Sequence, residues 1–398
     1  YSQSGTPKLE VSLVYDAKSK TATLKTKQSC AKTPGQDTKA PFLIPLSVAL
    51  FDSEGVKLPI RLNQDDSLSD KDVVLKITDP EQEFVFHGLD TAPVPSLLRG
   101  FSAPVNLEYP YSNDDLALLL SCDDDAFARW EAGQKLYTQA IFDLLEAYRQ
   151  GSSLQLNPIV VEAVRDVLTT NNAEQALLAQ ALSLPSEITL AQQMKTVDVD
   201  GLHVARKFLQ QELGKALRHE FQSIYDANQE KKEYSFDSES YGRRLLKNIA
   251  LSYLAAIDDP QAHQLCMEQF KLGHNMTDVI SALGCLSHSN TNQRIDAFNA
   301  FYEEWKGDVL VLDKWLALQA TSQRESTLED VQALTQHEAF TMKNPNRVRS
   351  LLGAFTQENP TGFHDKSGAG YKFIADKIIE LNSLNPQVAA RLLRTAFT

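Results

Sequence analysis

The spacing of hydrophobic residues changes once along the chain, from every second position to every third or fourth. Before residue 110, apolar and polar residues alternate over residues 9–15, 44–50 and 101–109. A period of two predicts strands that bury one face. Turn-forming residues separate these stretches, at 16–19, at Pro34-Gly35 and at 52–55. About six or seven short strands in such a length predict a β-sandwich.

From residue 110 onward the apolar residues follow the helical period and no strand pattern returns. The clearest faces are Ile141 to Tyr148, Leu209 to Ile224 and Tyr371 to Leu381. Ser326-Thr327-Leu328-Glu329 has the form of a capping box ahead of a helix. Many successive amphipathic helices without a fixed sequence repeat predict a solenoid-like array. We therefore expect an immunoglobulin-like β-sandwich domain over 1–109 and an α-helical domain over 110–398, a multidomain chain that is β and then all-α.

Two segments near the C-terminus start in the same way, with Asn followed by Pro. Asn344-Pro345 and Asn385-Pro386 each place Asn at a helix N-cap and Pro at the first helical position. Arginine follows within the next turns, as Arg349 and as Arg391. Residues 341–398 hold eight Lys and Arg against four Asp and Glu, in a chain of net charge −13. This local reversal of sign predicts a surface that meets negative groups.

The overall composition limits the classes of partner. An acidic chain lacks the broad basic footprint that nucleic-acid binding requires, and no apolar run approaches the roughly twenty residues of a membrane helix. The four widely spaced cysteines, without a C-x-x-C pair, are expected to be reduced, buried thiols in a cytoplasmic protein. The sequence opens at Tyr1 without an initiator Met and closes inside a helical pattern. We expect it to be an excerpt of a longer protein.

No catalytic motif is complete in this sequence. A helical zinc site needs a second His four residues after the first, but Ser223 follows His219-Glu220 at that place and Thr341 follows His337-Glu338. There is no G-x-S-x-G elbow and no phosphate-binding loop of Walker type. Asp123-Asp124-Asp125 could bind a cation, but the preference of helix N-termini for acidic residues explains these aspartates better. We expect neither catalytic nor metal-binding residues.

Several ungapped stretches, in order along nearly the whole chain, resemble the C-terminal half of bacterial aminopeptidase N, the zinc-dependent alanyl aminopeptidase family. The stretches are Tyr1-Ser2-Gln3-Ser4-Gly5-Thr6-Pro7, Phe101-Ser102-Ala103-Pro104-Val105, Asn275-Met276-Thr277-Asp278, Asp313-Lys314-Trp315, Leu318-Gln319-Ala320-Thr321-Ser322, the run from Phe340 to Phe355 and the run from Leu381 to Leu392. Several matches in one order are far more specific than any single short motif.

The resemblance implies a function for the whole and a role for this part. The parent would be a cytoplasmic, monomeric metallopeptidase that trims neutral or basic N-terminal residues from peptides, with zinc bound upstream and none bound here. The helical domain would close over the upstream catalytic domain of the same chain, enclose the active-site chamber and limit substrate access. By position, Gln387, Arg391 and Arg349 would bind substrate. Gln387 and Arg391 lie four apart and so share a helix face.

Other interpretations stay open from the residues alone. Arg349 and Arg391 could form ion pairs on a solvated face without touching substrate. The chain could also be a stand-alone helical scaffold for protein–protein interaction, or a peptide-binding protein with a complete pocket of its own.

Overall fold

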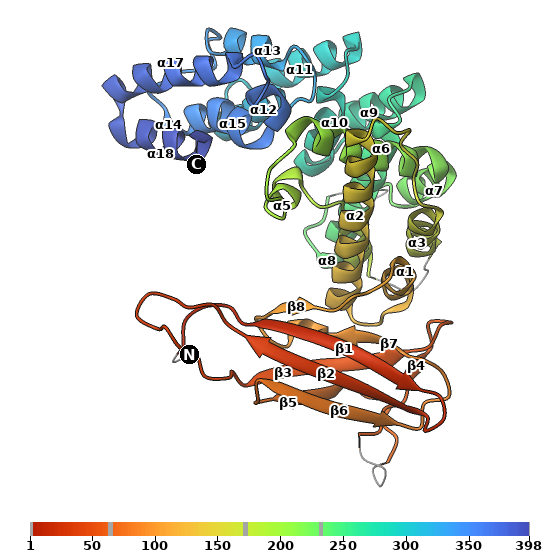
Figure 1. Cartoon of the computed structure of the whole chain (residues 1–398). Coiled ribbons are helices and arrows are strands. Elements are labelled where there is room, and N and C mark those ends of the chain that lie inside the picture. Colours follow the sequence, from red (N-terminus) through yellow and green to blue (C-terminus); the bar gives the residue numbers. More distant parts are fainter. Residues whose placement is uncertain (1–2, 63–66, 170–173, 231–233, 398) are drawn as a thin grey trace. The chain divides into compact units, whose positions relative to one another are not determined.

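A computed structural model describes residues 3–62, 67–169, 174–230 and 234–397 (Figure 1). Tyr1 and Thr398, the two ends of the sequence, lie outside the described residues. Strands come first and helices follow, which confirms the predicted fold class. Two compact units divide the chain: residues 1–140 with 156–185, and residues 141–155 with 186–398.

The first unit contains a β-sandwich of two four-stranded sheets. One sheet has the strand order β6-β2-β1-β8, and in the other β3 lies between β4 and β5 and also pairs with β7. β8 runs parallel to β1, whereas the other pairings are antiparallel. The strands are β1 (Lys8–Asp16), β2 (Thr21–Ser29), β3 (Ile44–Phe51), β4 (Lys57–Leu58), β5 (Val73–Ile77), β6 (Glu81–His87), β7 (Val94–Leu97) and β8 (Asn106–Glu108).

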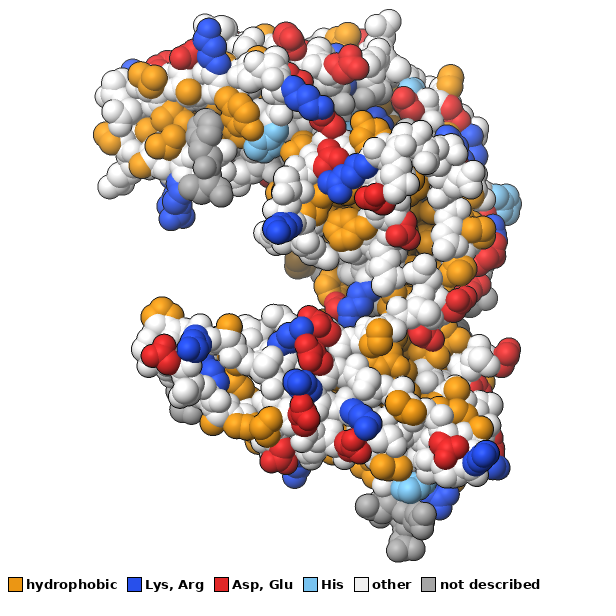
Figure 2. Space-filling model, in the orientation of Figure 1, with side chains coloured by type: hydrophobic (Ala, Val, Ile, Leu, Met, Phe, Trp, Pro, Cys, Tyr) orange, Lys and Arg blue, Asp and Glu red, His pale blue; other side chains and the backbone are white. Residues whose placement is uncertain are grey.

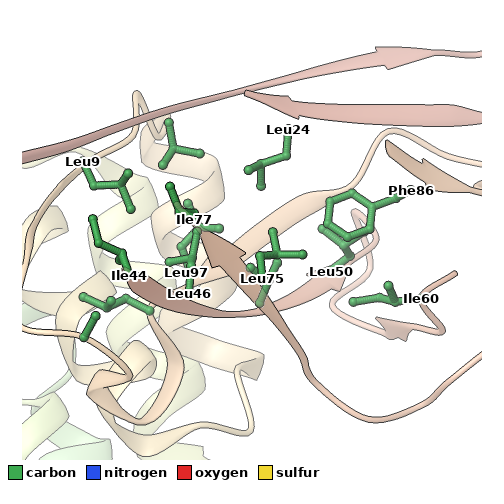
Figure 3. Close-up of a cluster of buried hydrophobic side chains, with 14 of the residues drawn as sticks. Leu9, Leu24, Ile44, Leu46, Leu50, Ile60, Leu75, Ile77, Phe86 and Leu97 are labelled. Carbon is green, nitrogen blue, oxygen red and sulfur yellow. The ribbon is translucent and has the colours of Figure 1, made fainter. Parts of the chain in front are cut away.

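Alternating residues of both sheets form the core of the sandwich. In Figure 3, side chains of β1, β2 and β6 point toward side chains of β3, β5 and β7. The labelled members are Leu9, Leu24, Ile44, Leu46, Leu50, Ile60, Leu75, Ile77, Phe86 and Leu97. The alternation read from the sequence therefore does mark the buried faces, because successive side chains of a strand point to opposite sides.

The opposite face of β1, β2 and β6 carries charged pairs. Lys25 and Lys27 of β2 lie directly opposite Glu83 and Glu81 of β6, and their charged atoms are 2.8 and 3.1 Å apart. Figure 2 shows basic and acidic side chains interspersed over this surface. Opposite charges at directly facing positions favour this register over a shifted one.

One predicted strand is much shorter than expected. Residues 101–109 alternate in sequence, yet only β8 forms there, and Phe101 belongs to the 3₁₀ turn η1 (Arg99–Phe101). Leu98, Gly100 and Phe101 all have positive φ angles, at 60°, 60° and 52°, which a strand does not allow. Ala103 and Val105 still enter the sandwich core without belonging to a strand.

Arg99, the first residue of the turn η1, is hydrogen bonded to three carboxylates. Its Nη1 donates to Asp123 at 2.5 Å and to Ser96 at 3.1 Å, its Nε donates to Asp72 at 2.8 Å, and its Nη2 donates to Asp124. Arg99 and Asp123 are both buried. This cluster ties the sandwich to the segment between the first two helices, within the first unit.

The same cluster accounts for Asp123-Asp124-Asp125. Asp125 caps the second helix by accepting from the N–H of Ala128 at 2.8 Å, as expected for an acidic residue at a helix N-terminus. Asp123 and Asp124 instead bind Arg99, so a helix N-terminus does not explain them. The helices of this unit are α1 (Asn113–Cys122), residues 126–140 of α2 (Ala126–Arg149), α3 (Pro158–Thr169) and α4 (Gln175–Ala181).

The second unit is a helical array in which each helix packs against its neighbours. α8 packs against α6, α7, α9 and α10, and α12 packs against α11, α13 and α15. Its elements, besides the end of α2, are α5 (Glu187–Ala191), α6 (Val199–Ala216), α7 (Arg218–Ala227), α8 (Ser238–Ala256), α9 (Pro260–Leu272), α10 (Met276–Ser287), α11 (Asn292–Trp305), α12 (Val309–Ala320), α13 (Thr327–Leu334), α14 (Pro345–Val348), η2 (Arg349–Gly353), α15 (Ala354–Glu358), α16 (Pro360–Phe363), α17 (Ala369–Leu384) and α18 (Pro386–Phe397).

Asp and Asn side chains begin most of these helices. Each accepts a hydrogen bond from a backbone N–H of the first turn, which satisfies a group that the helix cannot pair itself. The capping residues are Asp198, Asp237, Asp259, Asn275, Asp308, Asn344, Asn359 and Asn385. The predicted capping box at Ser326 is wrong, since α13 starts there but the Ser326 side chain makes no capping bond.

A second expectation fails at Leu217. Residues 209–224 were predicted as one continuous helix face. Instead, α6 ends and α7 begins at Leu217, which has non-helical dihedral angles of φ −115° and ψ 26°. Leu209, Leu213 and Leu217 are buried as expected. The apolar spacing continues across the break, so periodicity alone does not reveal it.

The Arg99 cluster leads to a stability prediction. Arg99→Ala leaves the buried Asp123 carboxylate without its partner, so the free energy of unfolding should fall by about 3–5 kcal/mol. Chemical denaturation measures this change. Lys25→Ala is the matched control, because it removes an exposed ion pair of the same unit, and such pairs contribute about 1 kcal/mol or less. Equal losses for the two variants would show that the cluster does not hold the unit together.

Candidate functional site

Both predicted Asn-Pro helix starts are present. Asn344 accepts from the N–H of Asn346 at 2.9 Å and Pro345 opens α14. Asn385 accepts from the N–H of Val388 at 3.2 Å and Pro386 opens α18. Figure 1 shows α14, α15, α17 and α18 together at the C-terminal end of the array. The capping bonds fix where each helix begins and therefore which side chains face outward.

Gln387 and Arg391 lie on one face of α18 and both are exposed. The opposite face is buried through Ala389 and Leu392, and α18 packs against α17, α15 and η2. The pair is therefore available for contact from outside the unit. No ion pair of Arg391 is found among the described residues, and the structure does not test the predicted contact with substrate.

Arg349 lies in η2, a π-helical turn in the middle of a helical segment. Its side chain is exposed, and its Nη1 donates weakly to Asn346 at 3.4 Å. η2 packs against α18, so the three predicted residues come from two elements in direct contact. A π-helical turn inserts one extra residue per turn and is found frequently at functional sites. The spacing of residues 349–353 does not predict this π-helical turn.

Arg347 differs sharply from Arg349, although the two are only two residues apart. Arg347 is buried, and its Nη1 donates to the backbone oxygen of Val309 at 2.8 Å and to the Asp313 carboxylate. It thus ties α14 to the start of α12. Among the arginines of residues 341–398, Arg347 therefore stabilises the array, whereas Arg349 and Arg391 face outward.

The second unit also contains cavities that were not predicted from the sequence. Two adjoining cavities of about 250 and 390 Å³ share Arg206 of α6 and Gln323, which follows α12. In the smaller one, His203 Nδ1 lies 2.8 Å from a carboxylate oxygen of Glu187. The larger one is lined by α6, α8, α9 and α10. Because its walls come from four different helices, no single local motif could reveal it.

The residues present do not fit a zinc ion. Within residues 3–62, 67–169, 174–230 and 234–397, no three His, Cys, Asp or Glu side chains come close enough to hold a metal. His219 and Glu220 lie on α7, and His337 Nδ1 accepts from the backbone N–H of Ala339. None of the helices in the described part of the chain is long and apolar enough to cross a membrane.

Comparison with known proteins connects these units to a family. Residues 5–110 match a domain of unknown function with an Ig-like fold (DUF3458), and residues 113–398 match a domain of unknown function with ARM repeats (DUF3458_C). Aminopeptidase N of Haemophilus influenzae is 38% identical over 393 residues, which are 99% of this chain and 44% of the relative. Aminopeptidase N of Escherichia coli is also 38% identical, over 99% of this chain and 45% of its own length.

This chain belongs to the aminopeptidase N family. It matches the C-terminal part of these proteins, as the sequence resemblance predicted, and it spans less than half of their length. A solved structure of aminopeptidase A from Legionella pneumophila, in complex with aspartic acid, is 31% identical with a TM-score of 0.82. That match covers 99% of this chain and 44% of the other.

The capping bond of Asn385 leads to a prediction about the local stability of α18. Asn385→Ala removes the capping bond and should cost about 1 kcal/mol, which corresponds to roughly fivefold faster hydrogen exchange of the α18 amides. Asn382→Ala, an exposed change at the end of α17, is the control and should leave α18 exchange unchanged. Equal exchange in both variants would contradict a role for the cap.

Proposed function

We propose that this chain is the non-catalytic C-terminal portion of a zinc-dependent aminopeptidase that removes N-terminal residues from peptides. The observation that carries the proposal is the similarity to aminopeptidase N along 99% of the chain. A zinc ion in such an enzyme polarises the scissile carbonyl and activates water. Since the described residues do not fit a zinc site, we assign the metal and its ligands to the remainder of the parent protein.

In this proposal the helical array encloses the active-site chamber. Its partner is the upstream catalytic domain of the same chain, within a cytoplasmic monomer. Peptides would enter through restricted openings, and folded proteins would be excluded by size. The β-sandwich would act as a mount for the array, because its outer sheet offers paired surface charges instead of a convergent polar site.

The exposed face of α18 and η2 would meet the peptide. The amide of Gln387 can both donate to and accept from a peptide group, and the guanidinium of Arg391 can donate to a carbonyl or carboxylate. Arg349, on the neighbouring turn, would add a second cation. Their exposure and the lack of an ion pair for Arg391 among the described residues favour this role over surface ion pairing.

The absence of a catalytic role for this part can be tested directly. The purified 398-residue chain should release no p-nitroaniline from alanyl-p-nitroanilide, with or without added zinc, because it contributes no metal ligand. The full-length parent protein, assayed in parallel, is the positive control. Zinc-dependent turnover by the pure chain would overturn the assignment.

The role of Arg391 can be tested in the full-length parent. Arg391→Ala should raise KM for peptides by about tenfold, the effect of losing one hydrogen bond from a charged donor, and leave the zinc content unchanged. Lys372→Ala removes an equal charge from the exposed surface of α17 and should leave KM unaltered. An unchanged KM and an unchanged residue preference in Arg391→Ala would show that Arg391 is a surface residue that does not contact the peptide.

A further inference from the structure

Two of the four cysteines lie next to each other in the second unit. Cys266 of α9 and Cys285 of α10 come from helices that pack along each other, and their side chains are hydrogen bonded. All four cysteines are free thiols, but only Cys266 is buried, so the expectation of uniformly buried thiols is wrong for the other three. The pairing could not be foreseen, because the two positions are 19 apart and share no motif.

The two thiols differ in access. Cys266 is 1% exposed and faces the core. Cys285 is partly exposed and lines the cavity of about 390 Å³ described above. A small reagent that enters this cavity therefore reaches Cys285 first and finds Cys266 directly behind it.

The cavity surrounds Cys285 with more basic than acidic groups. The charged and titratable side chains that line it are Arg206, Lys207, Asp258, His263 and His288. Asp258 is the single acid among them, and its Oδ1 lies 2.8 Å from His263 Nε2. Burial lowers the pKa of His288 to about 4, so that the fixed cations of the cavity are Arg206 and Lys207.

Access assigns the roles of the two thiols. The bond to Cys285 and burial both raise the pKa of Cys266, which disfavours its thiolate. Because an incoming reagent reaches Cys285 first, Cys285 is the nucleophile of the pair, and Cys266 is the thiol that can react with it afterwards.

We propose that Cys285 and Cys266 form a reversible disulfide when hydrogen peroxide enters the α6–α8–α9–α10 cavity. The Cys285 thiolate attacks one peroxide oxygen and the O–O bond breaks, giving Cys285 sulfenic acid and hydroxide. The Cys266 sulfur then displaces the sulfenic oxygen as water, with its proton, and the S–S bond forms. Two thiols are oxidised and one peroxide is reduced to two waters.

The remaining cysteines serve as internal references. Burial and the nearby Asp123 raise the pKa of Cys122 to about 11, which keeps it protonated and unreactive. Cys30 is partly exposed in the other unit, and its Sγ lies 3.9 Å from the backbone oxygen of Ser4. In the described part of the chain neither has a second thiol beside it.

The experiment is a thiol count on the 398-residue chain after exposure to peroxide. Free thiols, measured in denaturant, should fall from four to two and return to four with dithiothreitol. Mass mapping without reductant should identify one linked pair, Cys266 with Cys285. The variant Cys30→Ser/Cys122→Ser keeps the pair intact and should fall from two thiols to zero without forming dimers.

Single variants separate the two roles. Cys266→Ser should leave a sulfenic acid at Cys285 that dimedone traps, whereas Cys285→Ser should leave Cys266 unmodified. The proposal is wrong if Cys266 and Cys285 remain free at a peroxide exposure that oxidises Cys30. A linkage of either residue to a different cysteine would equally overturn it. Because the pair-only variant changes neither helix, a folding defect in a single variant does not prevent the decision.

Discussion

A charged side chain that is buried away from water needs an opposite charge beside it, and this constraint positions elements in both units. Arg99 meets Asp123 between the sandwich and its first helices, and Lys247 of α8 meets Asp278 of α10 at 2.6 Å. Arg347 meets Asp313 between α14 and α12. Removing one partner of such a pair leaves an uncompensated buried charge, which costs far more than the pair itself contributes. Each pair therefore specifies which elements are neighbours, while apolar packing supplies most of the stability.

The Lys247 cluster illustrates how fully such a charge is satisfied. Asn248 and Asn275 also donate to the Asp278 carboxylate, at 2.9 and 3.0 Å, and Gln269 donates to its backbone oxygen. Asn275 in turn caps α10 by accepting from the N–H of Asp278. The Asp278 carboxylate thus connects α8 to α10, and the backbone oxygen of the same residue connects α9 to them.

Much of this architecture could be predicted from the sequence, and the failures have physical causes. The change from strands to helices, the Asn-Pro helix starts and the shared face of Gln387 and Arg391 follow from local periodicity and capping chemistry. The turn at Arg99 does not, because its contacts with Asp72, Asp123 and Asp124 are long-range, and the helix break at Leu217 does not, because the apolar spacing continues across it. Arg347 and Arg349 look equivalent in sequence. Only the position of Asp313 makes one structural and leaves the other exposed.

We propose that the exposed residues of α18 and η2 contact peptide in the full-length protein. Arginine labelling with phenylglyoxal, with and without a bound non-hydrolysable peptide, tests this most directly. In the free enzyme, Arg349 and Arg391 should be modified while the buried Arg347 is not. Bound peptide should protect Arg349 and Arg391 and leave labelling of Arg243, on α8, unchanged. Equal labelling of Arg391 with and without peptide would contradict the account.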